Sequence, residues 1–130
     1  MKFLVDTHCW LWLQVSPTRL SAETLALLAD PANDLLLSAA SSWEIAIKYM
    51  LGKLPLPLPP AQYVPERMAA SGTHALPVEH AHALQVAALP THHRDPFDRL
   101  LIAQAQLEKL VLVTVDRQLD RYDVDIRFAN

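Results

Sequence analysis

Short apolar runs alternate with helical segments along most of this chain, and this alternation restricts the fold more than any other feature. The predicted strands are residues 3–5, 35–38, 74–76, 110–114 and 124–127. The predicted helices are residues 8–14, 20–29, 40–51, 61–71, 79–89 and 97–109. Strands that alternate with helices form a parallel sheet with helices on both faces. In such a sheet, ligands bind beyond the carboxyl ends of the strands, where the strand order reverses.

Single residues mark several of the predicted helix boundaries. Ser21 is a plausible N-cap for the second helix, and Gly52 follows the third helix as a C-terminal glycine does. Pro65 is a weak point inside the fourth helix, because proline removes one backbone hydrogen bond. The three tryptophans could stack on bases, but their spacing is more typical of core or interface residues; they are Trp10, Trp12 and Trp43.

The length and composition favour one globular domain over residues 1–130. Cys9 is the only cysteine, which suits a reducing compartment, and residues 1–6 do not form a signal peptide. No apolar run reaches the roughly 18 residues of a membrane span. We therefore expect a cytoplasmic protein. The net charge of −3 is unlike that of proteins that bind nucleic acid through charge alone.

Four carboxylates fall where the ligand edge of the sheet is expected. Asp6 directly follows the first strand, and Asp116 follows the strand that ends at Thr114. Asp98 lies on the apolar face of its helix, and Glu44 shares a face with apolar residues of the helix after the second strand. Like charges at such short range raise pKa values or require a cation. Oxygen ligands favour Mg²⁺ or Mn²⁺, which activate water and bind phosphate oxygens.

Each acid also has a purely structural interpretation. Asp6 would cap the helix that follows it, and Glu44 would pair with Lys48 on the surface. Asp98 would interact with the dipole of its helix, and Asp116 would begin a turn. The pattern of residues alone leaves both interpretations open for each acid.

Several segments together resemble the PIN-domain nucleases, and within them the VapC-type toxins of bacterial toxin–antitoxin pairs. The resemblance extends from Lys2 to about Phe128, and its most specific part runs from Asp95 to Ala105. The segments that carry it are Leu4–His8, Ser42–Lys48, Gly52–Leu54, His92–Ala105 and Leu112–Asp116.

This resemblance implies a three-layer α/β/α fold with a central parallel five-stranded sheet. It also implies a Mg²⁺- or Mn²⁺-dependent endoribonuclease that cleaves phosphodiester bonds with a metal-activated water. The acids of the family fall on Asp6, Glu44, Asp98 and Asp116. We expect Asp6, Asp98 and Asp116 to hold the metal, and Glu44 to ligate through water or to orient the attacking water. Supporting hydroxyl positions of the family match Thr7 and Thr114.

Other residues near these acids have less specific assignments. Asp95 is predicted to cap the helix that carries Asp98, with a supporting contact to the site as the lesser alternative. His93 is a weak candidate for substrate binding, and a zinc site is disfavoured because no second cysteine is present. The candidate RNA contacts are Arg94, Arg99, Lys48, Lys53 and Arg117, which are equally well explained as ordinary surface charges.

The resemblance further implies a homodimer bound to an antitoxin that places an apolar helix in a groove. The candidate surface for this partner is Trp10, Trp12 and residues 40–51. Two other classes of function stay open: a non-catalytic RNA-binding or scaffold module, and another acid-cluster phosphohydrolase. A haloacid-type phosphatase would have Asp-x-Asp after the first strand, whereas Thr7 and His8 follow Asp6.

Overall fold

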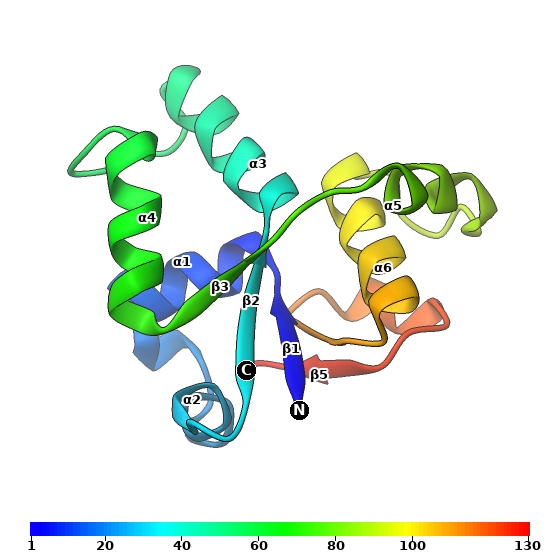
Figure 1. Ribbon diagram of the computed structural model, residues 1–130, viewed down its shortest axis with the longest axis horizontal. Coiled ribbons are helices and arrows are strands. Elements are labelled where there is room, and N and C mark those ends of the chain that lie inside the picture. The colour runs from blue at the N-terminus through cyan, green and yellow to red at the C-terminus, as the bar shows by residue number, and fades with distance from the viewer.

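Five parallel strands form the centre of the computed structural model, which describes residues 1–130 (Figure 1). They lie in the order β3-β2-β1-β4-β5. Their bounds are Lys2–Val5 for β1, Asp34–Ser38 for β2, Thr73–Leu76 for β3, Val111–Thr114 for β4 and Ile126–Phe128 for β5. The chain adds strands on one side of β1 and then returns to add β4 and β5 on the other side. The strand order therefore reverses between β1 and β4, which pair directly.

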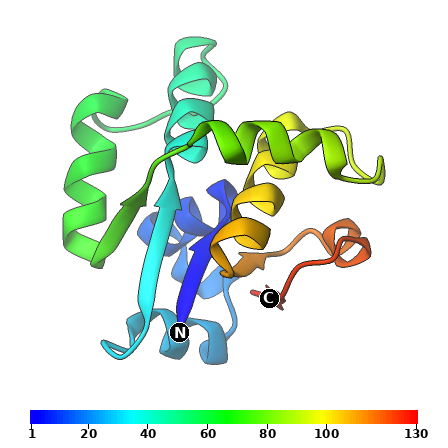
Figure 2. The same ribbon diagram turned by 45° about the vertical axis from the view of Figure 1, so that its right-hand side comes forward.

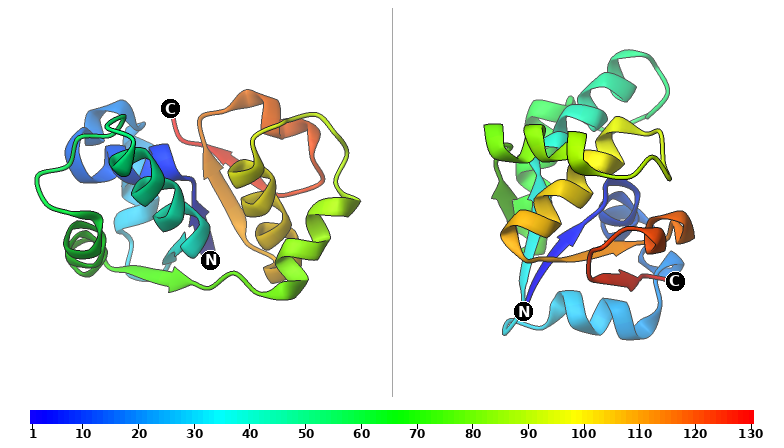
Figure 3. Two further views of the ribbon diagram at one scale, coloured as in Figure 1. Left: turned by 90° about the horizontal axis from the view of Figure 1, so that it is seen from above. Right: turned by 90° about the vertical axis from the view of Figure 1, so that its right-hand side faces the viewer.

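Six α-helices connect and cover these strands. They are α1 (Thr7–Val15), α2 (Ala22–Ala29), α3 (Ala39–Met50), α4 (Pro60–Ser71), α5 (His80–Gln85) and α6 (Pro96–Glu108). Helices α1, α2 and α4 lie on one side of the sheet, and α5 and α6 lie on the other (Figure 3, left). Helix α3 extends from the carboxyl end of β2 (Figure 1 and Figure 2). The predicted three-layer arrangement is confirmed. No helix has the length and apolar character needed to cross a bilayer.

The core has two halves, one on each face of the sheet, because neighbouring strand residues point to opposite sides. In β1, Phe3 and Val5 belong to the half that contains Trp10, whereas Leu4 belongs to the half packed on α6. All three of these β1 residues are buried, as are the last three residues of the neighbouring strand β4. The residue that follows β1 is thereby held at the centre of the molecule.

Most predicted boundaries are confirmed within two residues, but the helix predicted over residues 79–89 is α-helical only from His80 to Gln85 and continues as a 3₁₀ turn over Val86–Ala88. The side chain of Ser21 caps α2 by accepting a hydrogen bond from the Thr24 N–H, and Gly52 follows α3 with φ of 72°. Helix α4 continues through Pro65, because the carbonyl that loses its partner belongs to exposed Ala61 and is accessible to water. The predicted fifth strand begins two residues too early, since a short turn still occupies Val124, whose N–H donates to the Tyr122 carbonyl.

Trp10 corrects one prediction and confirms another. Its side chain is fully buried in the core, so it is not part of an exposed partner surface. The indole N–H donates to Thr73 Oγ1 on β3 at 3.1 Å. This hydrogen bond satisfies a polar atom inside the core and ties α1 to the edge of the sheet.

Replacement of Thr73 by Val should destabilise the fold, because the buried indole N–H of Trp10 would lose its acceptor without a large change in volume. A buried donor without a partner costs about 1–3 kcal/mol. Denaturant unfolding followed by tryptophan fluorescence measures the free energy of unfolding. Thr18→Val, at an exposed position, is the matched control. Equal unfolding free energies for the two variants would show that the Trp10–Thr73 hydrogen bond does not stabilise the fold.

Candidate metal centre and active site

Asp6 lies at the point where the strand order reverses. Asp6 directly follows β1, and the strand paired with β1, β4, ends at Thr114. The Thr114 hydroxyl donates a hydrogen bond to Asp6 Oδ2 at 2.5 Å. The other carboxylate oxygen, Oδ1, accepts a hydrogen bond from the Cys9 N–H at 2.8 Å. Asp6 therefore caps α1, as its structural interpretation predicted, and also faces the edge of the sheet. Only 6% of Asp6 is exposed, and this burial raises the pKa of its carboxyl group.

Asp98 reaches the same edge from the first turn of α6. Asp95 caps this helix by accepting hydrogen bonds from the N–H groups of Phe97 and Asp98, at 2.8 and 3.3 Å, so the predicted capping role is confirmed. Burial is the main cause that raises the pKa of Asp98 to about 7. The negative charges of Asp95, Asp6 and Glu44 raise it further, and His93 lowers it. The acids are thus close enough to act on one another electrostatically.

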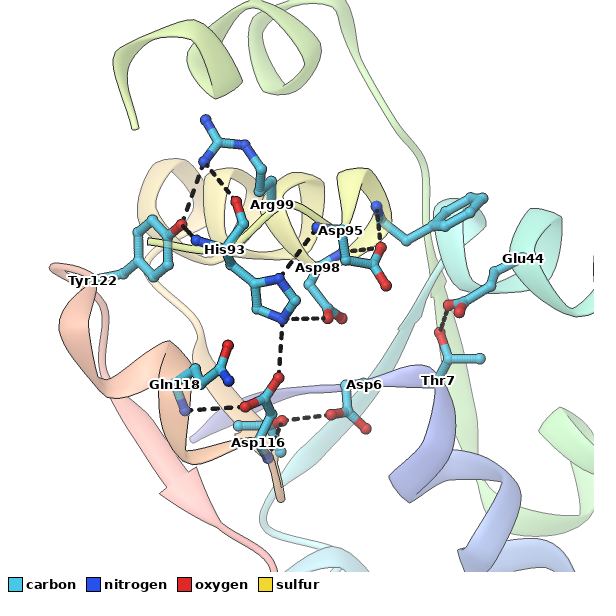
Figure 4. A network of polar contacts seen from close by, with 12 residues as sticks. Asp6, Thr7, Glu44, His93, Asp95, Asp98, Arg99, Asp116, Gln118 and Tyr122 are labelled. Carbon is cyan, nitrogen blue, oxygen red and sulfur yellow. Dashed lines mark hydrogen bonds and ion pairs between the residues drawn. The ribbon is translucent and has the colours of Figure 1, made fainter. Parts of the chain in front are cut away.

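His93 connects Asp98 with Asp116, which follows β4. His93 Nε2 lies 2.9 Å from Asp116 Oδ2 and 3.2 Å from Asp98 Oδ2. Figure 4 shows the imidazole between the two carboxylates, with Asp6 beside them on the side of Asp116. Asp116 also begins a short 3₁₀ helix, because its Oδ1 accepts a hydrogen bond from the Gln118 N–H at 3.0 Å.

Glu44 is set apart from this group. Thr7 Oγ1 lies 2.7 Å from Glu44 Oε1, and Lys48 Nζ lies 2.7 Å from Oε2. The predicted pair with Lys48 is present, but Glu44 is buried and not on the surface. In Figure 4 the Glu44 carboxylate points toward Thr7 and stands to one side of Asp6 and Asp98. The two threonines expected to support the site, Thr7 and Thr114, contact Glu44 and Asp6 respectively.

The donor set fits a hard divalent cation. One ligand atom each from His93, Asp98 and Asp116 lies within 4.8 Å of the others, and the Asp6 carboxylate is adjacent. Burial raises the pKa of Asp6, and burial together with neighbouring carboxylates raises that of Asp98, so a cation bound here would favour the charged forms. Carboxylate oxygens are ligands that Mg²⁺ and Mn²⁺ prefer.

The basic residues near the acids differ in what they contact. Arg94 is exposed, while Arg117 lies over the Phe128 ring at 4.1 Å and donates to Asn130 Oδ1. Arg99 has a structural role, since its guanidinium donates to four backbone carbonyls in the segment before α6. These carbonyls belong to Val86, Leu89, Pro90 and His93.

Two residues take a larger part in the site than the sequence predicts, namely His93 and Tyr122. His93 lies five residues before Asp98, within the segment His92–Ala105 that carries the family resemblance, so its position was a usable signal. The Tyr122 hydroxyl accepts hydrogen bonds from the His93 N–H at 2.8 Å and from Arg99 at 3.3 Å. No local pattern marked Tyr122, because its contact with residue 93 arises only when β4 and α6 pack together.

Comparisons with known proteins agree with this geometry. Over 60 residues the chain is 62% identical to Ribonuclease VapC16 of Mycobacterium tuberculosis (strain ATCC 25618 / H37Rv). This match covers 46% of the chain and 43% of that relative, so less than half of the relative's length is matched.

Solved structures with low sequence identity share the fold. One is VapBC2 from Rickettsia felis bound to a promoter DNA fragment, with a TM-score of 0.75, 16% identity and 100% of both chains covered. Another is VapBC-1 from nontypeable Haemophilus influenzae, with a TM-score of 0.65, 17% identity, and 98% of this chain and 97% of that chain covered. The family model of the PIN domain matches residues 3–125, which is most of the sequence. The chain therefore belongs to the PIN domain family.

Proposed function

We propose that this chain is a divalent-metal-dependent endoribonuclease and the toxin of a type II toxin–antitoxin pair. The observation that carries the proposal is the grouping of Asp6, Asp98 and Asp116 where the strand order reverses. Membership of the PIN domain family and the similarity to Ribonuclease VapC16 support RNA as the substrate. We also propose that the protein acts in the cytoplasm, where RNA is available as a substrate.

Asp6, Asp98 and Asp116 are the residues that we propose to hold a Mg²⁺ or Mn²⁺ ion. Such an ion lowers the pKa of water and offsets charge on the phosphate. Glu44, fixed by Thr7 and Lys48, orients the attacking water or binds the ion through water. The water attacks phosphorus opposite the leaving 3′ oxygen, so the products carry a 5′-phosphate and a 3′-hydroxyl.

Electrostatics supports binding of a polyanion only after a cation has entered. The acids would repel phosphate, and the chain has a net charge of −3. Arg94 is exposed beside the loop that carries His93, and it is the residue that we propose to contact an RNA phosphate. Lys48 is only partly available, because its Nζ is paired with Glu44 at 2.7 Å.

The proposed partners are an antitoxin and a second copy of the chain. Structures that share the fold include VapBC complexes and a toxin–antitoxin complex from Klebsiella pneumoniae. Helix α3 and the residue after it expose Trp43, Met50 and Leu51, with 61%, 75% and 58% of each residue accessible. Apolar residues this exposed on a helix are typical of protein interfaces.

Asp98→Asn should reduce Mg²⁺-dependent RNA cleavage about 100-fold or more, because one metal-binding charge is lost. Cleavage of a fluorescent single-stranded RNA, with and without EDTA, measures the rate. Asp34→Asn is the matched control, because Asp34 is an exposed acid at the opposite end of β2. The proposal would be contradicted if the wild-type protein cleaved RNA equally well in EDTA, or if Asp98→Asn cleaved RNA at the wild-type rate. Intact RNA with folded wild-type protein and Mg²⁺ would favour the non-catalytic alternative.

The pH dependence of stability tests the electrostatics of the site without any substrate. The pKa of Asp98 rises from 3.8 to about 7 on folding, so the folded state binds this proton more tightly. In EDTA, stability should therefore fall as the pH rises from about 4 to about 7. Asp98→Asn should remove much of this decrease and raise the melting temperature above pH 7. An equal pH dependence in the wild type and in Asp98→Asn would mean that Asp98 is not the group responsible.

A further inference from the structure

The imidazole of His93 occupies the space between two of the proposed metal ligands. Its Nε2 lies 2.9 Å from Asp116 Oδ2 and 3.2 Å from Asp98 Oδ2. This grouping would suit a metal ion bound by one nitrogen and two oxygens. Whether His93 is a third ligand depends on which ring nitrogen carries the proton, because only an unprotonated nitrogen binds a metal.

The second ring nitrogen of His93 decides this question. The backbone N–H of Asp95 donates to His93 Nδ1 at 3.1 Å. A backbone nitrogen is only a donor, so Nδ1 must offer a lone pair. In the neutral ring the proton is then on Nε2, which faces both carboxylates. The same contact disfavours a doubly protonated ring, since two N–H groups would then point at each other.

The backbone around His93 keeps the ring in this orientation. The His93 N–H donates to the Tyr122 hydroxyl at 2.8 Å, and Arg99 Nη1 donates to the His93 carbonyl at 3.3 Å. Arg99 also holds the loop through the carbonyls of Val86, Leu89 and Pro90. The Asp95 N–H itself is fixed, because Asp95 is the N-cap of α6.

We propose that His93 is a positioning residue that donates its Nε2–H to Asp98 and Asp116 and does not bind the metal. This inference rests on the proposed metal-dependent function. One N–H shared by two carboxylates orients their Oδ2 atoms and reduces their mutual repulsion. Each oxygen retains a further lone pair for a cation. The resulting site offers oxygen ligands alone, which favours Mg²⁺ or Mn²⁺ over zinc.

Nitrogen NMR of metal-free, ¹⁵N-labelled protein tests the donor role directly. At about pH 8, His93 should show a protonated Nε2 and an unprotonated Nδ1. The spectrum of His93→Gln identifies the His93 signals by their loss, and His74→Gln, an exposed position, is the control. Observation of the tautomer with a proton on Nδ1 would overturn the proposal.

Electron spin-echo spectroscopy of the Mn²⁺-loaded protein tests the exclusion of His93 from the metal. We expect no coupling from an imidazole ¹⁴N in the wild type, and a spectrum unchanged in His93→Gln. A nitrogen coupling that disappears in His93→Gln would overturn the proposal. Failure of Mn²⁺ and Mg²⁺ to bind at all would instead contradict the proposed function, and the NMR result would still decide the donor role.

Rescue by a conservative variant separates positioning from general structural support. A glutamine amide offers one acceptor for the Asp95 N–H and one donor for the carboxylates, whereas leucine offers neither. His93→Gln should keep RNA cleavage within about tenfold of the wild type, and His93→Leu should lose about 10–100-fold relative to His93→Gln. Equal losses in two folded variants would overturn the positioning role.

Discussion

Repulsion between carboxylates is the interaction on which the rest of the site depends. Asp6, Asp98 and Asp116 lie together at one edge of the sheet, and the positive charge of Lys48 is paired with Glu44. In the absence of a cation, uncharged hydrogen-bond donors therefore stabilise the carboxylates. The Thr114 hydroxyl donates to Asp6, and burial together with the neighbouring negative charges raises the pKa of Asp98.

A rigid surrounding structure is needed to keep these groups together. The strand that precedes Asp6 is buried on both faces, so its end cannot move away without exposing core. The loop before α6 has no regular structure, and Arg99 replaces backbone pairing there with hydrogen bonds to loop carbonyls. A basic residue close to the acids thus contributes to the shape of the site.

Much of the fold followed from periodicity and from single residues at boundaries. Apolar runs indicated the strands because a strand buried on both faces admits few polar side chains. The position of Asp6 directly after such a run placed it at the sheet edge, and Asp95 ahead of an apolar stripe indicated a cap. These inferences succeeded because each depends on neighbours within one or two helical turns. The fifth strand was shifted because its start is set by the turn at Val124, which carries no local signal.

The amino-acid sequence by itself determined the parallel α/β architecture and the family, and it indicated the four candidate acids, because these depend on local patterns and motifs. Only the tertiary structure decided how the polar groups share the site. It separated Glu44 from the other acids, buried Trp10, assigned Arg99 to the loop and placed His93 between Asp98 and Asp116. Hydrogen bonds between segments far apart in the chain depend on packing geometry, and spacing along the sequence does not encode that geometry.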